Sequence, residues 1–106
     1  MTESPERRND QRISIRLPIV MHGPDGAVKH GTTENVSRRG MLLVAQGPAS
    51  KGTLLRVAIT GVDGRERDVA AEVVRATPEG RLAVIVAEHS AGAMREIVEA
   101  GGSAAG

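Results

Sequence analysis

Short apolar runs, separated by turns that contain glycine or proline, constrain the fold of this chain more than any other feature. Ile13, Ile15 and Leu17 alternate with polar residues and lead into the apolar residues 19–21. The sequence GPDG at 23–26 then predicts a turn. Strands of this length between closely spaced turns favour an all-β barrel or sandwich over a plan of alternating strands and helices.

The same pattern continues through the middle of the chain. Residues 27–33 are expected to return antiparallel and to lead through Glu34 into a polar turn, after which 41–45 form a continuous apolar strand. A loop is expected at 46–52, followed by a hairpin with its turn at 61–64. The apolar residues that alternate in this hairpin are Leu55, Val57 and Ile59 in the first strand and Val69, Ala71 and Val73 in the second, where the adjacent Val74 indicates a bulge or burial on both faces.

The last third of the chain predicts one more strand and a helix. Residues 82–87 are apolar on both faces, so this strand should be central or covered. Ser90 is a reasonable N-cap for a helix whose apolar face carries Met94, Ile97 and Val98 and which should end near Ala100. We therefore expect a flexible arm at 1–12, a β-barrel plus helix at 13–100 and a disordered tail at 101–106.

Composition limits the possible functions. The 106 residues suffice for one domain, whose core must be aliphatic because the chain has no aromatic residue. The absence of cysteine is compatible with a reducing cytosol, and no apolar stretch is long enough to span a membrane, so a soluble cytoplasmic protein is expected. A net charge of +1 argues against a protein that coats long nucleic acids.

Two polar clusters carry the chemistry of the sequence. Residues 8–12 read R-x-x-x-R, with Arg8 and Arg12 just ahead of the first strand, and residues 35–40 read N-x-S-x-x-G. A guanidinium group can donate two hydrogen bonds to guanine O6 and N7, bind a phosphate bidentately or stack on a purine. The arm could instead be solvated, with its arginines paired to acidic neighbours at positions 6 and 10.

The second cluster also allows two interpretations. Asn35 and Ser37 should point polar groups into a turn, where they could bind a ligand or hydrogen-bond their own backbone. Gly40 is expected to adopt a backbone conformation that disfavours a residue with a Cβ atom. The adjacent Arg38 and Arg39 add positive potential.

In their order and spacing, the two clusters resemble the cyclic di-GMP site of PilZ domains. The resemblance covers nearly the whole chain and implies a six-stranded antiparallel β-barrel with a short C-terminal helix. It implies that Arg8 and Arg12 clasp guanine and phosphate, that Asn35 and Ser37 contact a guanine, and that Gly40 shapes the loop. Arg7 occupies the position that the family links to binding of a stacked nucleotide pair, and Arg39 is peripheral.

The sequence departs from the family pattern in its last strand. PilZ domains usually carry glycine and aromatic residues there, whereas residues 81–87 read RLAVIVA. This departure concerns the packing of the strand against the helix. Since no aromatic side chain is available to stack on a base, stacking would fall to the arginines.

Enzymatic functions are not supported by the sequence. His22, His30 and His89 lie in separate segments without metal-ligand spacing, and no glycine-rich phosphate loop opens a helix. Ser37 is not part of a G-x-S-x-G nucleophile elbow. We expect no catalytic residue, no bound metal and no cofactor.

The leading hypothesis is a non-catalytic receptor for cyclic di-GMP. Ligand binding would order the arginine arm against the barrel and change a surface for an unidentified protein partner, with the protein a monomer or a ligand-linked dimer. The resemblance implies roles in motility, surface polysaccharide and biofilm formation. Two alternatives are a degenerate PilZ-like module that binds protein and no nucleotide, and, with less support, a small barrel that binds RNA or single-stranded DNA.

Overall fold

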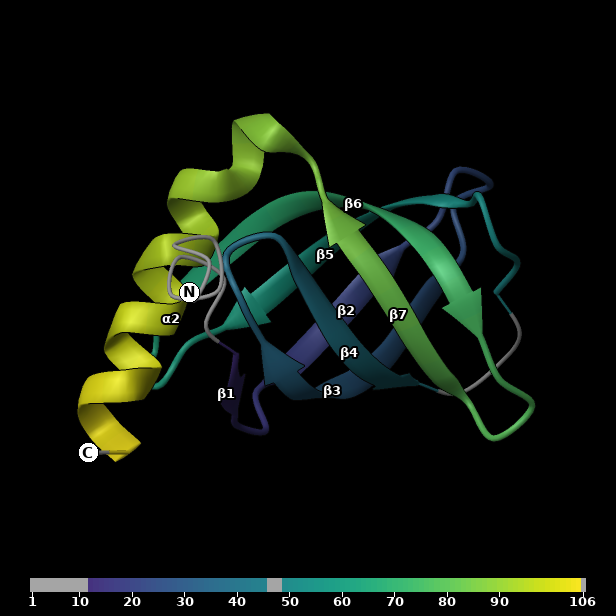
Figure 1. The fold of residues 1–106 in the computed structure, drawn as a ribbon. Helices are drawn as coiled ribbons and strands as arrows, with labels where there is room; N and C mark the ends of the chain where they lie inside the picture. Colours follow the sequence, from purple (N-terminus) through teal and green to yellow (C-terminus); the bar gives the residue numbers. More distant parts are fainter. Residues whose placement is uncertain (1–11, 46–48, 106) are drawn as a thin grey trace, which may run out of the picture.

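A closed antiparallel barrel forms the body of the protein, which we describe from a computed structural model at residues 12–45 and 49–105 (Figure 1). Its strands are connected in the order β3-β2-β5-β6-β7-β4, and pairing of β3 with β4 closes the ring, while a short strand β1 extends it beside β3. The predicted six-stranded barrel is confirmed. The strands are β1 (Ile13–Ser14), β2 (Pro18–His22), β3 (Val28–Val36), β4 (Gly40–Ala45), β5 (Leu54–Thr60), β6 (Glu66–Ala76) and β7 (Arg81–Val86).

The first predicted strand is interrupted, because a threonine side chain takes over its hydrogen bonding. Thr33 of β3 is fully buried, and its hydroxyl accepts a hydrogen bond from Leu17 N–H at 2.9 Å and donates one to the Ile15 carbonyl at 2.6 Å. The Thr33 backbone N–H also donates to the Leu17 carbonyl. These bonds satisfy the polar backbone groups between β1 and β2, so both pieces remain attached to β3.

We predict that Thr33→Val destabilises the protein by about 1–3 kcal/mol, because it keeps the shape of the side chain but leaves a buried N–H and a buried carbonyl unsatisfied. Chemical denaturation would measure the loss. Thr32→Val, the same change at the exposed neighbouring position of β3, is the control and should stay within about 0.5 kcal/mol of wild type. Equal effects of the two substitutions would contradict this role of the hydroxyl.

The predicted alternation of core residues is confirmed in β5, β6 and β7. A register shift between Val73 and Arg75 confirms the bulge expected near Val74. The last strand is central, as one of the two predicted alternatives, because β7 pairs with both β6 and β4, although Ile85 is 55% exposed on its outer face. The side chains of these strands that belong to the core cluster are Leu55, Val57, Ile59, Val69, Ala71, Val73, Leu82, Val84 and Val86.

A short 3-10 turn, η1 (Glu88–Ser90), leads into helix α2 (Ala91–Ala105), which packs against the barrel through the buried Met94 and Ile97. The hydroxyl of Ser90, predicted to be an N-cap, accepts a hydrogen bond from Ala70 N–H of β6 at 3.0 Å. This bond attaches the start of the helical segment to the barrel. Among the described helices, none is long and apolar enough to cross a bilayer.

The predicted end of the helix near Ala100 is wrong, because α2 continues through the two glycines to Ala105. Gly101 is buried, and a Cβ atom there would lie 2.9 Å from Ile13 Cδ1 and 3.1 Å from Ile15 Cδ1. The glycine therefore permits close packing of the helix against the start of the barrel and does not end it. The predicted division into arm, barrel and tail is otherwise untested, since residues 1–11 lie outside the described part of the chain.

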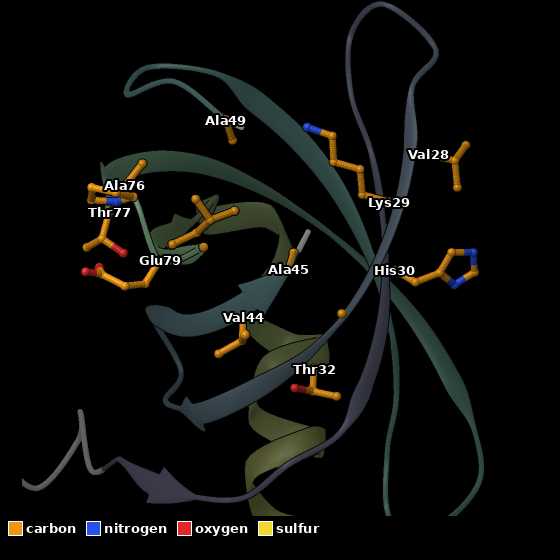
Figure 2. A pocket seen from close by; sticks show the side chains of 14 residues that line it. Val28, Lys29, His30, Thr32, Val44, Ala45, Ala49, Ala76, Thr77 and Glu79 are labelled. Atoms are coloured by element: carbon orange, nitrogen blue, oxygen red, sulfur yellow. The ribbon is translucent and has the colours of Figure 1, made fainter. Parts of the chain in front are cut away.

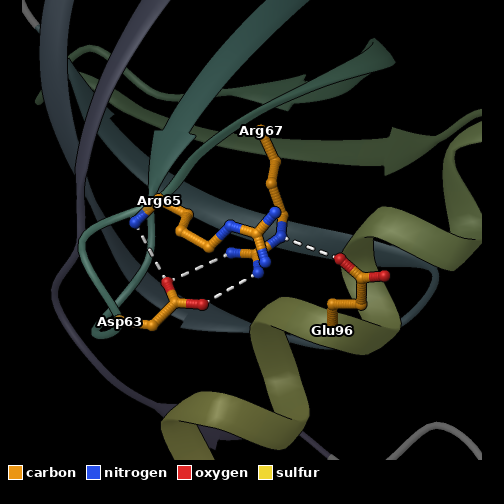
Figure 3. Close-up of polar contacts among 4 residues, drawn as sticks. All are labelled: Asp63, Arg65, Arg67 and Glu96. Carbon is orange, nitrogen blue, oxygen red and sulfur yellow. Dashed lines mark hydrogen bonds and ion pairs between the residues drawn. The ribbon is translucent and has the colours of Figure 1, made fainter.

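An ion-pair cluster connects the β5–β6 turn to helix α2 (Figure 3). Arg67 of β6 bonds to Asp63 in the turn at 2.9 Å and to Glu96 of α2 at 3.0 Å. The side-chain hydrogen bond from Arg67, with a backbone hydrogen bond from Arg65, lowers the pKa of Asp63 from 3.8 to about 2. The two carboxylates in turn raise the pKa of Arg67.

A carboxylate whose pKa is lowered by folding stabilises the folded state above its unfolded pKa and loses that effect as the pH falls through its folded pKa. We therefore predict that Asp63→Asn lowers Tm at pH 7 and that the difference from wild type disappears between about pH 4 and pH 2. Thermal melts across this range would measure it. Asp25→Asn, the same change in the β2–β3 turn, is the control, and an unchanged Asp63→Asn deficit at pH 2 would contradict the prediction.

Candidate functional site

The N-x-S-x-x-G cluster forms the tight turn that joins β3 to β4. Ser37 N–H donates to the Gly40 carbonyl at 2.9 Å, and the buried Ser37 hydroxyl lies within hydrogen-bond distance of Gly40 N–H at 3.2 Å and Arg39 N–H at 3.4 Å. The same hydroxyl can donate to the Gly40 carbonyl at 3.2 Å. The sequence left open whether Ser37 binds a ligand or hydrogen-bonds its own backbone. In the structure, its hydroxyl bonds to the backbone of the turn and so stabilises the turn.

Gly40 is required for a different reason from the one predicted. Among the described glycines, positive φ angles occur at positions 26, 52, 64 and 80, and Gly40 is not one of them. A Cβ atom at Gly40 would instead lie 2.7 Å from the Val84 carbonyl oxygen of β7. The missing side chain thus allows β4 and β7 to approach closely beside the turn.

We predict that Gly40→Ala destabilises the protein by about 1–3 kcal/mol, because the new methyl group must displace the backbone of β7. Gly92→Ala is the matched control: a Cβ atom there meets nothing within 4 Å, so the substitution in the helix should stabilise by about 0.5–1 kcal/mol. Urea denaturation of both variants would test the pair. A Gly40→Ala protein as stable as wild type would show that β7 is free to move.

Strand pairing brings the two sequence clusters together. The register of β1 with β3 pairs Ile13 with Val36 and Ser14 with Asn35, which places Arg12 beside the β3–β4 turn. Arg12 Nη1 donates a hydrogen bond to Asn35 Oδ1 at 2.6 Å, and both side chains are accessible to solvent. The contact is diagonal across the strand pair, a separation that a long side chain can span. One arginine of the first motif thus meets the first residue of the second.

The remaining predicted site residues are distributed around this contact. Arg39 lies exposed at the tip of the turn. Arg7 and Arg8 lie outside the described residues, so their roles stay predictions. Arg12, Asn35, Ser37, Arg39 and Gly40 are therefore brought together within one turn and the strand beside it.

The outer wall of the barrel beside the turn is apolar. Asn35 pairs with Leu42, which pairs with Ala83, and in the next row Gly40 pairs with Ile85. Because Leu43, Leu82 and Val84 point into the core, these alternate residues face outward. An ion pair between Glu34 and Arg81, at 3.2 Å, borders the same wall. Sequence reasoning missed this surface, since its members come from three strands.

A groove of 630 Å³ lies on the other side of the turn, between β7 and the start of α2. We call it the basic groove. Figure 1 shows the β3–β4 turn and the end of β7 close to this helix. The residues that line the groove are Arg38, Arg39, Ile85, Val86, Glu88, Ala91, Gly92 and Arg95. Arg95 and Glu88 were not among the residues predicted from sequence.

A larger, open hollow of 1330 Å³ lies at a different part of the barrel, between the start of β3, the end of β4 and the β6–β7 turn (Figure 2). Figure 2 shows Lys29 and His30 projecting to opposite sides of β3. Of the predicted ligand-binding residues that the structure describes, none lines this hollow. Within the described ranges, no group of three His, Cys, Asp or Glu side chains could hold a metal ion.

Comparison with known proteins identifies the family. The sequence model of the PilZ domain matches residues 6–100, which include both motifs. The chain belongs to the PilZ family. PilZ proteins are cyclic di-GMP receptors, and their domains are generally non-catalytic binding modules. A search of curated proteins finds no significant match.

Solved structures agree with the PilZ assignment at the level of the fold. The PilZ domain of CeSA from a cellulose-synthesizing bacterium superposes with a TM-score of 0.70 and 23% identity, over 84% of this chain and 96% of that one. MotI/DgrA, an inhibitor of motility from Bacillus subtilis, superposes with a TM-score of 0.65 and 20% identity, over 88% of this chain and 50% of that one. The atypical last strand of this chain therefore still forms a PilZ-type barrel.

Proposed function

We propose that this protein is a non-catalytic receptor for cyclic di-GMP. The observation that carries the proposal is the hydrogen bond between Arg12 and Asn35, because it joins the two motifs at one solvent-accessible place on the barrel. Their side chains supply a guanidinium fork and an amide, which together can recognise the edges of a guanine and a phosphate. Ser37 and Gly40 hold the turn that presents them.

The arm gives the receptor a means of signalling. Arg12 is attached to the barrel through β1, whereas Arg7 and Arg8 precede it in a segment rich in polar and charged residues. A ligand that contacts Arg8 and Arg12 together with Asn35 favours the arm conformation that lies against the barrel. This preference can change a partner surface only if the ligand binds the ordered arm more tightly than the free arm.

The partner of this receptor is a protein of unidentified sequence, and the setting is the bacterial cytoplasm. Motility, surface polysaccharide and biofilm formation are the outputs that membership of the family suggests. The protein would act as a monomer, or as a dimer joined by stacked ligands if Arg7 contributes to binding a nucleotide pair.

Isothermal titration with cyclic di-GMP tests the proposal. Arg8→Ala and Arg12→Ala should each weaken binding at least about tenfold, the expected cost of losing charged hydrogen bonds to a phosphate or base. Asn35→Ala should weaken it by a smaller factor, since a neutral hydrogen bond is worth less. GTP should not compete.

The matched control is Arg56→Ala, which removes an exposed arginine on β5, across the barrel from β4. This variant should bind as wild type does. A wild-type protein that gives no heat and no thermal stabilisation at high ligand concentration would refute the receptor function and support a PilZ module that binds only protein. Salt-sensitive binding to unrelated oligonucleotides would instead favour the nucleic-acid alternative.

A further inference from the structure

The outer face of strands β6 and β7 carries two neighbouring rows of side chains, which the pairing register defines. In the described part of the chain, helix α2 packs at one end of the barrel and leaves this face uncovered (Figure 1). We call the face the two-row wall. Its first row consists of Leu54, Glu72, Ile85 and Gly40, and its second row consists of Arg75, Ala83 and Leu42.

Exposed apolar side chains mark the two-row wall as a surface for a partner. Leu54 and Ile85 flank Glu72 in the first row, and they are 65% and 55% exposed. Ala83 and Leu42 extend the apolar surface in the second row. Large exposed apolar side chains that gather on one wall and are bordered by charged groups are typical of an interaction site.

The charged groups of the wall are complementary from one row to the next. Glu72 pairs with Ile85 and Arg75 pairs with Ala83, so the acid and the base lie on one strand in neighbouring rows. Both side chains are exposed, and within the described ranges neither forms an ion pair. Each copy of the chain therefore presents one acid and one base that are available to a partner.

The sizes of the apolar side chains are complementary in the same way. On β7 the first row has the large Ile85 and the second row has the small Ala83. On β4 the order is reversed, because Gly40 lies in the first row and Leu42 in the second. Each large side chain thus has a small residue at the matching position of the other row.

We propose that the two-row wall binds the same wall of a second copy of the chain, about a two-fold axis that lies between the rows and runs across the strands. In a two-fold pair, each row meets the other row of the opposite copy, and every contact occurs twice. Glu72 of each copy then faces Arg75 of the other, and Ile85 faces Ala83. Leu42 lies opposite Gly40 by the same symmetry.

A second copy fits this wall because the wall is complementary to itself in both charge and side-chain size. The net charge of +1 gives little repulsion between two copies. The two ion pairs fix the orientation of the copies, while the apolar side chains supply the contact area. Because the wall of a closed barrel is convex, the contact is centred on β6 and β7, and a small contact of this kind is typical of a weak, reversible pair.

Sedimentation velocity of the full chain without nucleotide, from micromolar to millimolar protein, tests the surface. The wild-type protein should show a reversible monomer–dimer equilibrium. Ile85→Glu should weaken the association at least about tenfold, because it places a charge at the centre of the contact. Val28→Glu is the matched control, since Val28 is 54% exposed on β3 and lies outside the two-row wall, and this variant should associate as wild type does.

Charge exchange tests the orientation of the two copies. Glu72→Arg and Arg75→Glu should each weaken the association at least about tenfold, because each places like charges opposite one another. The double variant Glu72→Arg/Arg75→Glu should associate as wild type does, and an equal mixture of the two single variants should form a mixed dimer. Rescue of this kind distinguishes a contact between copies from damage within one copy.

The inference does not require ligand binding, so its failure is separate from that of the proposed function. A wild-type protein that stays monomeric at millimolar concentration overturns the inference and leaves the receptor function standing. A dimer that Ile85→Glu leaves intact, or a double variant that stays as weak as the single ones, also overturns it. A protein that pairs through this wall but binds no cyclic di-GMP refutes only the receptor function.

Discussion

The geometry of the candidate site depends on one irregularity in strand β3. The pairing of β3 with β4 is regular at Thr33 with Leu43 and resumes at Asn35 with Leu42, so Glu34 is an extra residue in β3. Thr33 and Val36 are both fully buried although three positions separate them, which a regular strand does not allow. The bulge therefore turns Asn35 outward, where Arg12 meets it.

The same bulge accounts for the interruption of the first strand. Since it leaves the Thr33 hydroxyl inside the barrel, this group can bond to the backbone between β1 and β2. The chain that precedes Leu17 is thereby held on β3, and Ser14 pairs with Asn35. The two motifs are distant in sequence, and it is this pairing that brings Arg12 next to the turn.

Sequence periodicity was sufficient to predict the barrel, because burial alternates with a period of two in β6, β7 and the first half of β5, and each hairpin has its turn residues. It was not sufficient for the features that depend on a partner strand. Gly40 is needed because the Val84 carbonyl lies close to where a Cβ atom would be placed. Ile85 is exposed beside Gly40, its pairing partner on β4, which has no side chain to cover it. Gly101 lies within the helix, where two isoleucine side chains fill the space that a Cβ atom would need. None of these constraints is local in sequence.

For the candidate site, the two motifs could be identified from the sequence, but how they lie relative to each other in space could be predicted only in part. The chemistry of arginine, asparagine and serine is visible in the motifs, whereas Glu88 and Arg95 lack any local pattern and become candidates only because α2 lies beside β7. The position of α2 in turn depends on tertiary contacts: Ser90 bonds to β6, and Arg67 joins Glu96 to the β5–β6 turn. Helix packing thus determines half of the basic groove.

The absence of aromatic residues distinguishes the proposed binding site from one that stacks bases on rings. An aliphatic floor such as Leu42, Ala83 and Ile85 offers apolar contact without a preferred ring geometry, so it contributes little to the choice of base. In the proposed site, selectivity would then come from polar groups at the edges of the base, and the described side chains that meet there are Arg12 and Asn35. A guanidinium fork that donates to guanine O6 and N7 does not match adenine, which presents an amino donor at N6, so in the proposed site Arg12 would contribute to the discrimination between guanine and adenine. Under the proposed function, ligand recognition would therefore depend on hydrogen bonding at the rim of the site, with the barrel wall supplying an apolar surface.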